Sequence, residues 1–276
     1  MLVHSRSGRW TAWAVFFVLF LPVFALPFLV VLMASFATNW SGAFPSHPTL
    51  THYQDITKGD SAHALTTSLW TALAASVLAL LVGGWAALAA ERLRGWQRRL
   101  LDTLFMLPVA VPSVVVGLSL LVAFSKPPLL LNGTREIVIL AHTVLVTAFA
   151  YQSVSAALVR LDPAYERSAA SLGARPAYVL WRIRLPLLLP SLTAAAGLCF
   201  ALSMGELSAT MMLYPPDWLP LPVQIYGATN RGSLYSGAAL AVVLMVTTLL
   251  VLLGMSRVRT RASYRCPPLF PFLLPD

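Results

Sequence analysis

Six long apolar stretches constrain this sequence more than any other feature. Each is long enough for the roughly 20 residues that an α-helix needs to cross a bilayer. They are Thr11–Phe36, Thr66–Ala90, Leu101–Phe124, Ile137–Val159, Leu187–Leu213 and Tyr235–Met255. Because unpaired backbone groups are costly in lipid, segments of this kind must be helical. The sequence therefore predicts an all-α integral membrane protein with six transmembrane helices.

The overall composition agrees with this interpretation. Hydrophobic residues make up 58% of the chain and charged residues only 11%, whereas soluble domains are about a quarter charged. A net charge of +9 would favour nucleic-acid binding in a soluble protein. Here the basic residues adjoin apolar stretches, so they indicate membrane orientation instead. Cys199, in an apolar stretch, and Cys266, in a basic tail, predict neither a disulfide framework nor a metal site.

The basic residues also predict how the chain is oriented. Most of the 19 lysines and arginines fall on one side of the six stretches. On that side lie Arg6, Arg9, Arg92, Arg94, Arg98, Arg99, Arg160, Arg167, Arg175, Arg182, Arg184, Arg257, Arg259, Arg261 and Arg265. Since positive residues concentrate in cytoplasmic loops, both termini and the segment Asp162–Pro186 are expected in the cytoplasm.

The spacing of the apolar stretches predicts a single membrane domain over residues 1–276. Residues 11–61 are expected to form a first, peripheral helix and an external loop that contains Pro45, Pro48 and Gly59. Residues 62–257 are expected to form a compact core of five helices. Residues 258–276 are expected to form a cytoplasmic tail.

The longest charged segment, Asp162–Pro186, predicts two short helices joined by a tight turn. Asp162 is a suitable cap for the first helix, because its carboxylate can accept hydrogen bonds from free N–H groups of the first turn. Gly173 suits the end of that helix, since glycine adopts the left-handed conformation without a steric penalty. Pro176 suits the start of the second helix, and Pro186 is expected to end or kink it.

On the first of these helices, one acid and several small side chains share a face. Spacings of three or four residues bring together Glu166, Ala169, Ala170 and Gly173. Small side chains allow a partner to approach the backbone closely, so this face predicts a docking surface. The alternative is an ordinary solvated loop.

Two prolines interrupt the third stretch. Pro108 and Pro112 lie four residues apart and are followed by Gly117. A proline inside a helix leaves a backbone carbonyl without its helical partner, so a neighbouring helix or a water-filled path has to satisfy that carbonyl. The pattern predicts either a kinked helix that lines a transport path or a kink that serves packing alone.

Glu206 lies within the fifth stretch. An ionisable group at that depth costs about 2.5–3.5 kcal/mol on insertion scales unless it is paired or faces water. We expect Glu206 either to line the transport path or to be a structural acid bonded to a backbone group or a hydroxyl. His142, alone in an apolar stretch, is interpreted as a packing residue without a metal partner.

Motifs of enzymes are missing from the sequence. It contains no phosphate-binding loop, no His-Glu-x-x-His motif, no nucleophile elbow and no group of His and Cys at metal-ligand spacing. We therefore expect no catalytic, cofactor-binding or metal-ligating residues. Secondary transporters often show internal repeats and several polar residues near the bilayer midplane. This sequence shows no convincing repeat and only one acid, Glu206, within an apolar stretch. It therefore favours a conduit driven by a partner protein over a secondary transporter.

A pattern within the charged segment resembles a known family. It consists of Glu166, Ala169, Gly173, Ile183, Leu185 and Pro186, with nine residues between the glycine and the isoleucine. This pattern resembles the cytoplasmic signature loop of binding-protein-dependent ABC importer permeases. Residues 107–118 and 205–216 resemble the corresponding segments in the branch that serves phosphonate, iron, thiamine, sulfate and molybdate.

The likeness covers about residues 62–257. A closer one, which includes residues 124–129 and 132–134, extends over nearly the whole chain and is to permeases of 2-aminoethylphosphonate importers. The chain departs from the family at Arg167 and Ser168, where members often carry a polar or acidic residue and an alanine, respectively. Permeases for ferric iron, thiamine, sulfate, molybdate or another small solute are the alternative within the family, and an ion-coupled secondary transporter is the alternative outside it.

The resemblance implies a type I importer permease fold, of the MetI-like kind, with a cytoplasmic coupling helix. It implies a bacterial inner-membrane subunit that pairs with a second permease, rests on two ATPase subunits that use ATP, and receives substrate from a periplasmic binding protein. The residues implied in ATPase coupling are Glu166, Ala169, Ala170, Gly173, Arg175, Ile183, Leu185 and Pro186. Candidates for the translocation path are Glu206, Pro108 and Pro112.

Overall fold

The computed structural model describes residues 6–42, 45–56 and 59–264. The described residues form two compact units. Unit 1 comprises residues up to 63 together with 224–245, and unit 2 comprises residues 64–223 together with those from 246 onwards. The predicted tail at 258–276 continues the last helix as far as Tyr264, and the remainder lies outside the described residues.

Unit 1 contains the first long helix and a short structured connection. Helix α1 (Arg6–Ser35) is followed by strands β1 (Ala37–Asn39) and β2 (Ser46–Pro48), which pair antiparallel, and by helix α2 (Thr51–Ile56). The Tyr53 hydroxyl donates to Ser35 Oγ at 2.7 Å, and a His52 ring nitrogen lies 3.1 Å from the Ala37 carbonyl oxygen. These bonds attach α2 to the end of α1 and to the start of β1.

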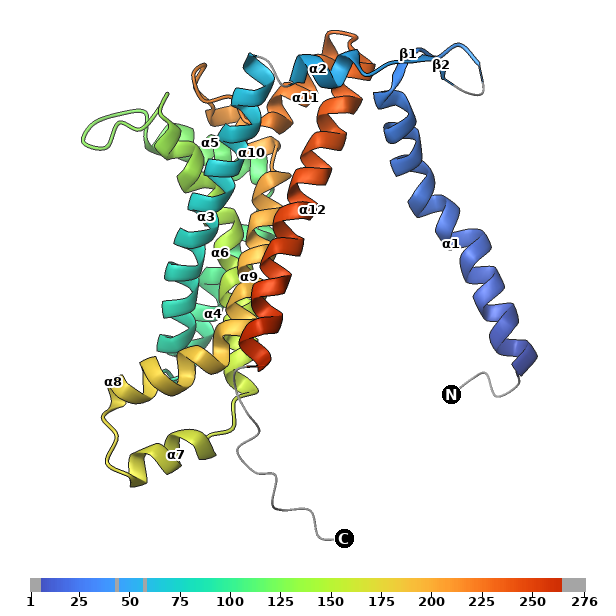
Figure 1. Cartoon of the computed structure of the whole chain (residues 1–276). Helices are drawn as coiled ribbons and strands as arrows, with labels where there is room; N and C mark the ends of the chain where they lie inside the picture. Colours follow the sequence, from blue (N-terminus) through green and yellow to red (C-terminus); the bar gives the residue numbers. More distant parts are fainter. Residues whose placement is uncertain (1–5, 43–44, 57–58, 265–276) are drawn as a thin grey trace. The chain divides into compact units, whose positions relative to one another are not determined.

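Unit 2 is a helical bundle with helices of unequal length. Its elements are α3 (Asp60–Ala90), α4 (Trp96–Ala110), α5 (Ser113–Ala123), α6 (Arg135–Val159), α7 (Ala164–Ser171), α8 (Pro176–Val179), the π-helical turn η1 (Leu180–Arg184), α9 (Leu185–Met204), α10 (Ser208–Leu213), the start of α11 (Leu221–Asn230) and the second part of α12 (Leu234–Tyr264). Helices α3, α11 and α12 each extend from one unit into the other. Within unit 2, α7 and α8 lie at one end and α5 and α10 at the other (Figure 1).

Five described helices are long and apolar enough to cross a membrane: Gly8–Ser35, Asp60–Ala90, Arg135–Val159, Pro176–Met204 and Leu234–Arg257. They confirm five of the predicted spans. The predicted third span, 101–124, is not one kinked helix. It forms α4 and α5, which are bent by 103° where Val111 is extended, so the count is six if the bent pair is one span. The fifth span was predicted over 187–213, but its continuous helix ends at Met204.

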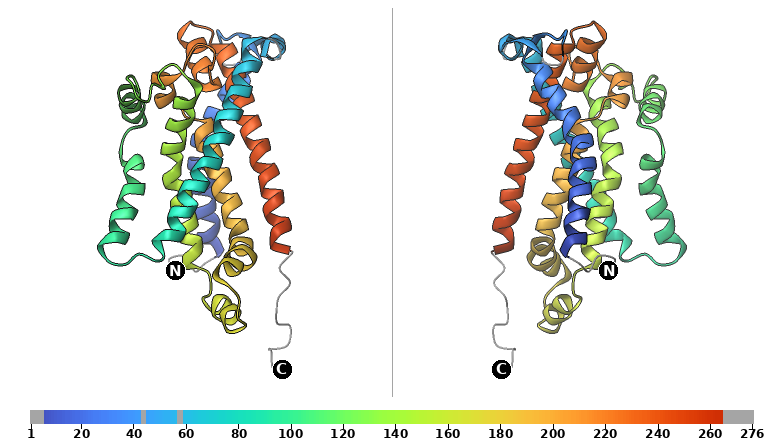
Figure 2. Two further views of the ribbon diagram at one scale, coloured as in Figure 1. Left: turned by 90° about the vertical axis from the view of Figure 1, so that its left-hand side faces the viewer. Right: turned by 90° about the vertical axis from the view of Figure 1, so that its right-hand side faces the viewer.

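Helix α6 lies at the centre of unit 2. In its most apolar window 61% of the residues are buried, against 39% for α3 and 28% for the helix that ends at Met204. It packs along α9, and the two run side by side in Figure 2. Helix α3 packs on it as well, because Ala87 and Ala90 of α3 share a buried cluster with Tyr151 and Val154 of α6 and with Leu188 of α9.

At Gly83, α3 and α6 approach each other closely because this position has no side chain. A Cβ atom at Gly83 would lie 2.9 Å from the Tyr151 backbone nitrogen and 3.0 Å from the Thr147 carbonyl oxygen. Real Cβ atoms essentially never come so close to backbone atoms. A Cβ atom at the next position, Gly84, would have no described atom within 4 Å.

These two adjacent glycines give a matched test of the packing. We expect Gly83→Ala to lower stability by about 1–3 kcal/mol, because the added methyl group overpacks the α3–α6 contact. Gly84→Ala is expected to leave stability unchanged or to raise it by up to about 1 kcal/mol, since alanine favours helix. Thermal unfolding of the purified variants in detergent measures both. Equal shifts for the two variants would contradict this account of the packing.

Candidate functional site

The charged segment forms an elbow, residues 162–186, that leaves the bundle as α7 and returns through α8. Asp162 Oδ1 accepts a hydrogen bond from the Ala164 N–H at 2.8 Å, which confirms the predicted cap. The carboxylate thereby satisfies one of the four N–H groups that a helix leaves unpaired at its start.

The turn of the elbow has the geometry expected for a glycine-terminated helix. The Ala174 N–H donates to the Ala169 carbonyl at 3.0 Å, and the Gly173 N–H donates to the Ala170 carbonyl at 3.0 Å. Gly173 has φ of +79°, in the left-handed region where a side chain is unfavourable. The two bonds form a Schellman motif, which ends α7 and turns the chain toward α8.

The second helix does not end at Pro186. Helix α8, the π turn η1 and α9 follow one another without a break, and the Leu185 N–H donates to the Leu180 carbonyl across the π turn. Pro186 falls in the first turn of α9, where the missing N–H of proline costs little. The prediction that Pro186 ends or kinks this helix is therefore wrong. The irregularity is a π turn just before Pro186, and α8 continues through it directly into a membrane-spanning helix.

Arg184 connects the elbow to the bundle by charge. Its Nη2 is paired with Glu91 Oε2, just beyond the end of α3, and its Nε lies 3.0 Å from Glu166 Oε1 on α7. The contact with Glu166 is an ion pair whose N–H is not aligned for a hydrogen bond. The Arg184 side chain is 19% exposed, so solvent screens these pairs less than it does fully exposed ones.

An open cleft of about 850 Å³ lies between the end of α3 and the elbow. Trp85, Leu88, Ala89, Arg92 and Leu93 line the α3 side, and Glu166, Arg167, Ala170, Ala174, Pro176, Ala177, Val179, Leu180 and Arg184 line the elbow side. The walls are largely apolar and the charges are arginines together with Glu166.

The small residues predicted to share one face of α7 differ in their exposure to solvent. Ala169 is buried, with 9% exposure, and faces into the protein. Ala170 and Gly173 are exposed. The most exposed apolar residue of the elbow is Leu172, at 88%, and the tyrosines Tyr165 and Tyr178 are exposed as well. Sequence reasoning missed these three residues because it looked for small side chains and charges, although a leucine beside a helix-ending glycine in a polar segment was a usable signal.

The other residues implied in coupling occupy different surroundings. Arg175 is exposed and precedes α8, and Pro186 is exposed at the start of α9. Ile183 and Leu185 are half-buried along the π turn and α9. The elbow therefore offers an exposed tip, which includes Leu172 and Gly173, and a root that packs on the bundle.

Glu206 lies in a helix break rather than inside a span. Gly205 ends α9, and Glu206 Oε1 accepts a hydrogen bond from the Ala209 N–H at 2.8 Å, in the first turn of α10. The residue is half-buried. Glu206 was expected either to line the transport path or to be a structural acid, and the bond to a backbone group that the second expectation describes is observed. A carboxylate at this position supplies the acceptor that the new helix needs.

His142 has a larger structural role than packing. It is buried, and its Nδ1 lies 2.7 Å from Ser203 Oγ and its Nε2 lies 2.8 Å from Thr210 Oγ1. The ring thus joins α6 to both sides of the break between α9 and α10. Sequence reasoning missed this link because the two hydroxyls lie more than 60 residues away along the chain.

The two prolines mark the break between α4 and α5. Pro108 is inside α4 and half-buried, whereas Pro112 is exposed and precedes the first residue of α5. Beyond the break, a Cβ at Gly117 would lie 2.9 Å from Ala209 Cα, so α5 and α10 meet backbone to backbone. The broken segments of the third and fifth stretches therefore pack against each other.

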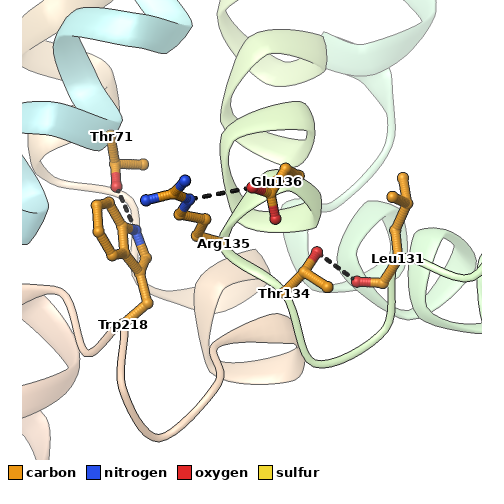
Figure 3. Close-up of polar contacts among 6 residues, drawn as sticks. All are labelled: Thr71, Leu131, Thr134, Arg135, Glu136 and Trp218. Atoms are coloured by element: carbon orange, nitrogen blue, oxygen red, sulfur yellow. Dashed lines mark hydrogen bonds and ion pairs between the residues drawn. The ribbon is translucent and has the colours of Figure 1, made fainter.

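A second group of polar side chains lies at the start of α6, the helix whose other end leads to the elbow, and Figure 3 shows its contacts. The Trp218 indole N–H donates to Thr71 Oγ1 on α3 at 3.0 Å. The Arg135 guanidinium lies 5.8 Å from the centre of the Trp218 ring, and Arg135 Nε pairs with Glu136 Oε1 at 3.0 Å. These contacts attach the loop between α10 and α11 to the start of α6.

Comparison with known proteins identifies the class. Residues 79–264 match the family model described as "Binding-protein-dependent transport system inner membrane component". Since the match covers more than half of the chain, the protein belongs to this family. It is a permease subunit of an ABC importer and not an enzyme, and this excludes the ion-coupled secondary transporter.

Two relatives in that family are similar in sequence to this chain. The chain is 46% identical to PhnV of Salmonella typhimurium, a permease protein assigned to a 2-aminoethylphosphonate transport system, over 96% of this chain and 100% of PhnV. It is 36% identical to the molybdenum transport system permease protein ModB of Mycobacterium tuberculosis, over 72% of this chain and 80% of ModB.

Solved structures agree on the fold. A chain of the bacterial alginate ABC transporter, in complex with a periplasmic protein bound to an alginate pentasaccharide, gives a TM-score of 0.70 at 18% identity over 92% of this chain and 93% of that one. A chain of the inward-facing MetNI methionine ABC transporter gives 0.62 at 14% identity over 73% of this chain and 95% of that one. These matches confirm the predicted MetI-like importer fold.

The ion pairs of Arg184 lead to a prediction about the elbow. We expect Arg184→Gln to weaken the attachment of α7 by roughly 1 kcal/mol, because both acids lose their partner. Backbone amides of α7 should then exchange hydrogen about fivefold faster, as measured by mass spectrometry. Arg182→Gln is the control, since Arg182 lies on the same π turn and has no ion pair among the described residues. Equal exchange in the two variants would show that Arg184 does not hold α7.

Proposed function

We propose that this chain is the permease of an importer for 2-aminoethylphosphonate. The observation that carries the proposal is the 46% identity to PhnV, which extends over 96% of this chain and all of that relative. Identity to the molybdenum permease is lower and covers less of both chains. A permease for another small solute of the same branch, such as ferric iron, thiamine, sulfate or molybdate, is the alternative.

The elbow and both termini face the cytoplasm of a bacterium in this proposal. Support comes from the concentration of arginines at that end of the bundle, including Arg92, Arg94, Arg167 and Arg175, because basic residues favour the cytoplasmic side of an inner membrane. Trp218 and Arg135 then belong to the periplasmic end, where a substrate-binding protein approaches.

The partners are two cytoplasmic ATPase subunits, a second permease of the same or a related chain, and a periplasmic binding protein. The ATPase subunits use ATP, and this chain itself holds no cofactor. Leu172 gives the elbow an exposed apolar tip, and the exposed rings of Tyr165 on α7 and Tyr178 on α8 add apolar surface of the kind that fits a cleft in a protein partner. Ala170, Gly173 and Arg175 lie beside it, exposed as docking requires.

The elbow is built to transmit movement. Helix α8 continues through the π turn into α9, and Arg184 ties Glu166 of α7 to Glu91 beyond α3. Movement of the elbow by a closing ATPase pair therefore acts on α3 and α9 together. Such coupling drives alternating access, in which substrate enters from the periplasmic side and leaves into the cytoplasm.

The translocation path in this proposal runs by the broken helices. Glu206 is half-buried at the break after α9, and Pro108 and Pro112 flank the break between α4 and α5. Irregular backbone at membrane depth is tolerated where it is buried in protein or lines a water-filled cavity. The negative carboxylate of Glu206 would suit the ammonium group of the substrate.

Reconstitution tests the substrate. The permease, its ATPase subunits and its binding protein are placed in vesicles, and uptake of labelled 2-aminoethylphosphonate is measured with ATP and with ADP. We expect uptake with ATP and no uptake with ADP. Uptake of thiamine, ferric iron, sulfate or molybdate in place of 2-aminoethylphosphonate would overturn the substrate assignment while leaving the family unchanged.

Gly173 tests the docking. Gly173→Val forces a branched side chain into a left-handed conformation at a cost of roughly 1–2 kcal/mol and adds bulk at the tip. We expect the variant to insert in the membrane and to lose co-purification with the ATPase subunits. Gly173→Asn is the control, because asparagine tolerates this conformation. Normal ATPase association of Gly173→Val would count against docking at the elbow.

Glu206→Gln separates the two roles of that residue. The amide oxygen preserves the hydrogen bond to Ala209 but removes the negative charge, so we expect the unfolding temperature to stay within a few degrees of that of the original protein. If Glu206 contacts substrate, uptake falls clearly. Full uptake at unchanged stability would leave Glu206 with a capping role alone.

A further inference from the structure

Two cavities adjoin on one side of unit 2. The first is the open cleft of about 850 Å³ between the end of α3 and the elbow. The second is a slot of about 360 Å³ between α3 and α9. Trp85 and Leu88 line both of them, so together they form a groove from the interior of the apolar spans to the charged elbow.

The slot is apolar and lies within the membrane-spanning part of the two helices. Its walls include Val77 and Leu81 from α3 and Leu192 from α9, and Trp181 of the π turn lines it as well. Gly84 opens the slot, because no described atom lies within 4 Å of a Cβ built there. At this depth a cytoplasmic protein cannot enter, so the slot is filled by lipid or by another membrane helix.

The cleft adds positive charge to one end of the slot. Arg92, just past α3, and Arg167, on α7, are exposed at its edge. Within the described part of the chain neither takes part in an ion pair. The cleft wall also includes Glu166, but its carboxylate is paired with Arg184, so the unpaired charge is positive.

We infer that this groove binds an anionic phospholipid, with an acyl chain in the slot and the phosphate at Arg92 and Arg167. An aliphatic slot suits the chain, and tryptophans such as Trp85 and Trp181 suit the depth of the lipid headgroups. Guanidinium groups bind phosphate through paired, charge-assisted hydrogen bonds. Basic pockets between transmembrane helices bind acidic headgroups in this way.

Charge complementarity favours this occupant over a second permease subunit. A neighbouring helix would fill the apolar slot without needing the two arginines. A zwitterionic phospholipid would fill it too, but its headgroup carries no net charge for the arginines to attract. The groove is therefore expected to select an anionic over a zwitterionic lipid, and the bound lipid would join the end of α3 to the elbow.

Tryptophan quenching tests the selectivity. The permease with its partner subunits is reconstituted in phosphatidylcholine vesicles that contain a small, equal fraction of either dibrominated phosphatidylglycerol or dibrominated phosphatidylcholine, since bromine quenches adjacent tryptophan. We expect stronger quenching by phosphatidylglycerol, and we expect Trp85→Phe combined with Trp181→Phe to remove the excess. Equal quenching by the two lipids would overturn the inference.

Paired arginine variants test the headgroup contact. Arg92→Gln with Arg167→Gln should lower the preference for phosphatidylglycerol by roughly thirtyfold, because each arginine near an acidic membrane surface strengthens binding roughly fivefold. Arg94→Gln with Arg99→Gln is the control, since it removes equal charge from residues that line neither cavity. An undiminished preference in the first pair, or an equal loss in both, would overturn the inference.

A photo-crosslinking residue at Leu81, which is exposed in the slot, tests the occupant directly. Crosslinks to lipid are expected. Crosslinks that join two permease subunits at this position would show that the slot is a protein interface and would overturn the lipid site.

Discussion

Within a bilayer, a backbone N–H or C=O group that leaves a helix finds no water to replace its hydrogen bond. The breaks in this protein are arranged around that constraint. After α9 stops at Gly205, the Glu206 carboxylate accepts the N–H of Ala209, and the Thr210 hydroxyl donates to the Glu206 carbonyl at 3.1 Å. The His142 ring then holds Thr210 and Ser203. The break is thus stabilised by side chains from the break itself and from the central helix.

The elbow satisfies its own backbone groups with local contacts. Asp162 caps α7, and the turn at Gly173 pairs the last carbonyls of that helix. Arg184 then connects the elbow to Glu91 and Glu166 by charge. Local hydrogen bonds fix the shape of the elbow, whereas α7 is attached to the bundle by the ion pairs of Arg184 and by the buried side chain of Ala169. A permease needs a part that keeps its form while it changes position, and this division of contacts suits that need.

Several features were predictable because they depend on residues close together in the chain. Five apolar helices, the cap at Asp162 and the glycine turn at Gly173 all follow from local composition and local hydrogen bonding. The signature residues from Glu166 to Pro186 also indicated the family correctly. By contrast, the continuity of α8 with α9 was missed, since a π turn before Pro186 has no clear local signal. The exposure of Leu172 and the burial of Ala169 were missed because both depend on how α7 lies against its neighbours.

The sequence by itself determined that the chain is helical, lies in a membrane and carries a charged elbow with a family signature, because these depend on hydrophobic length, charge position and short-range spacing. The tertiary structure decided which apolar stretches are broken and what each buried polar group contacts. Glu206 became a helix cap and His142 a link between helices only when residues distant in sequence came together. Hydrogen bonds in an apolar interior are formed with whatever the fold brings within about 3 Å, and one sequence read along its length does not contain that geometry explicitly.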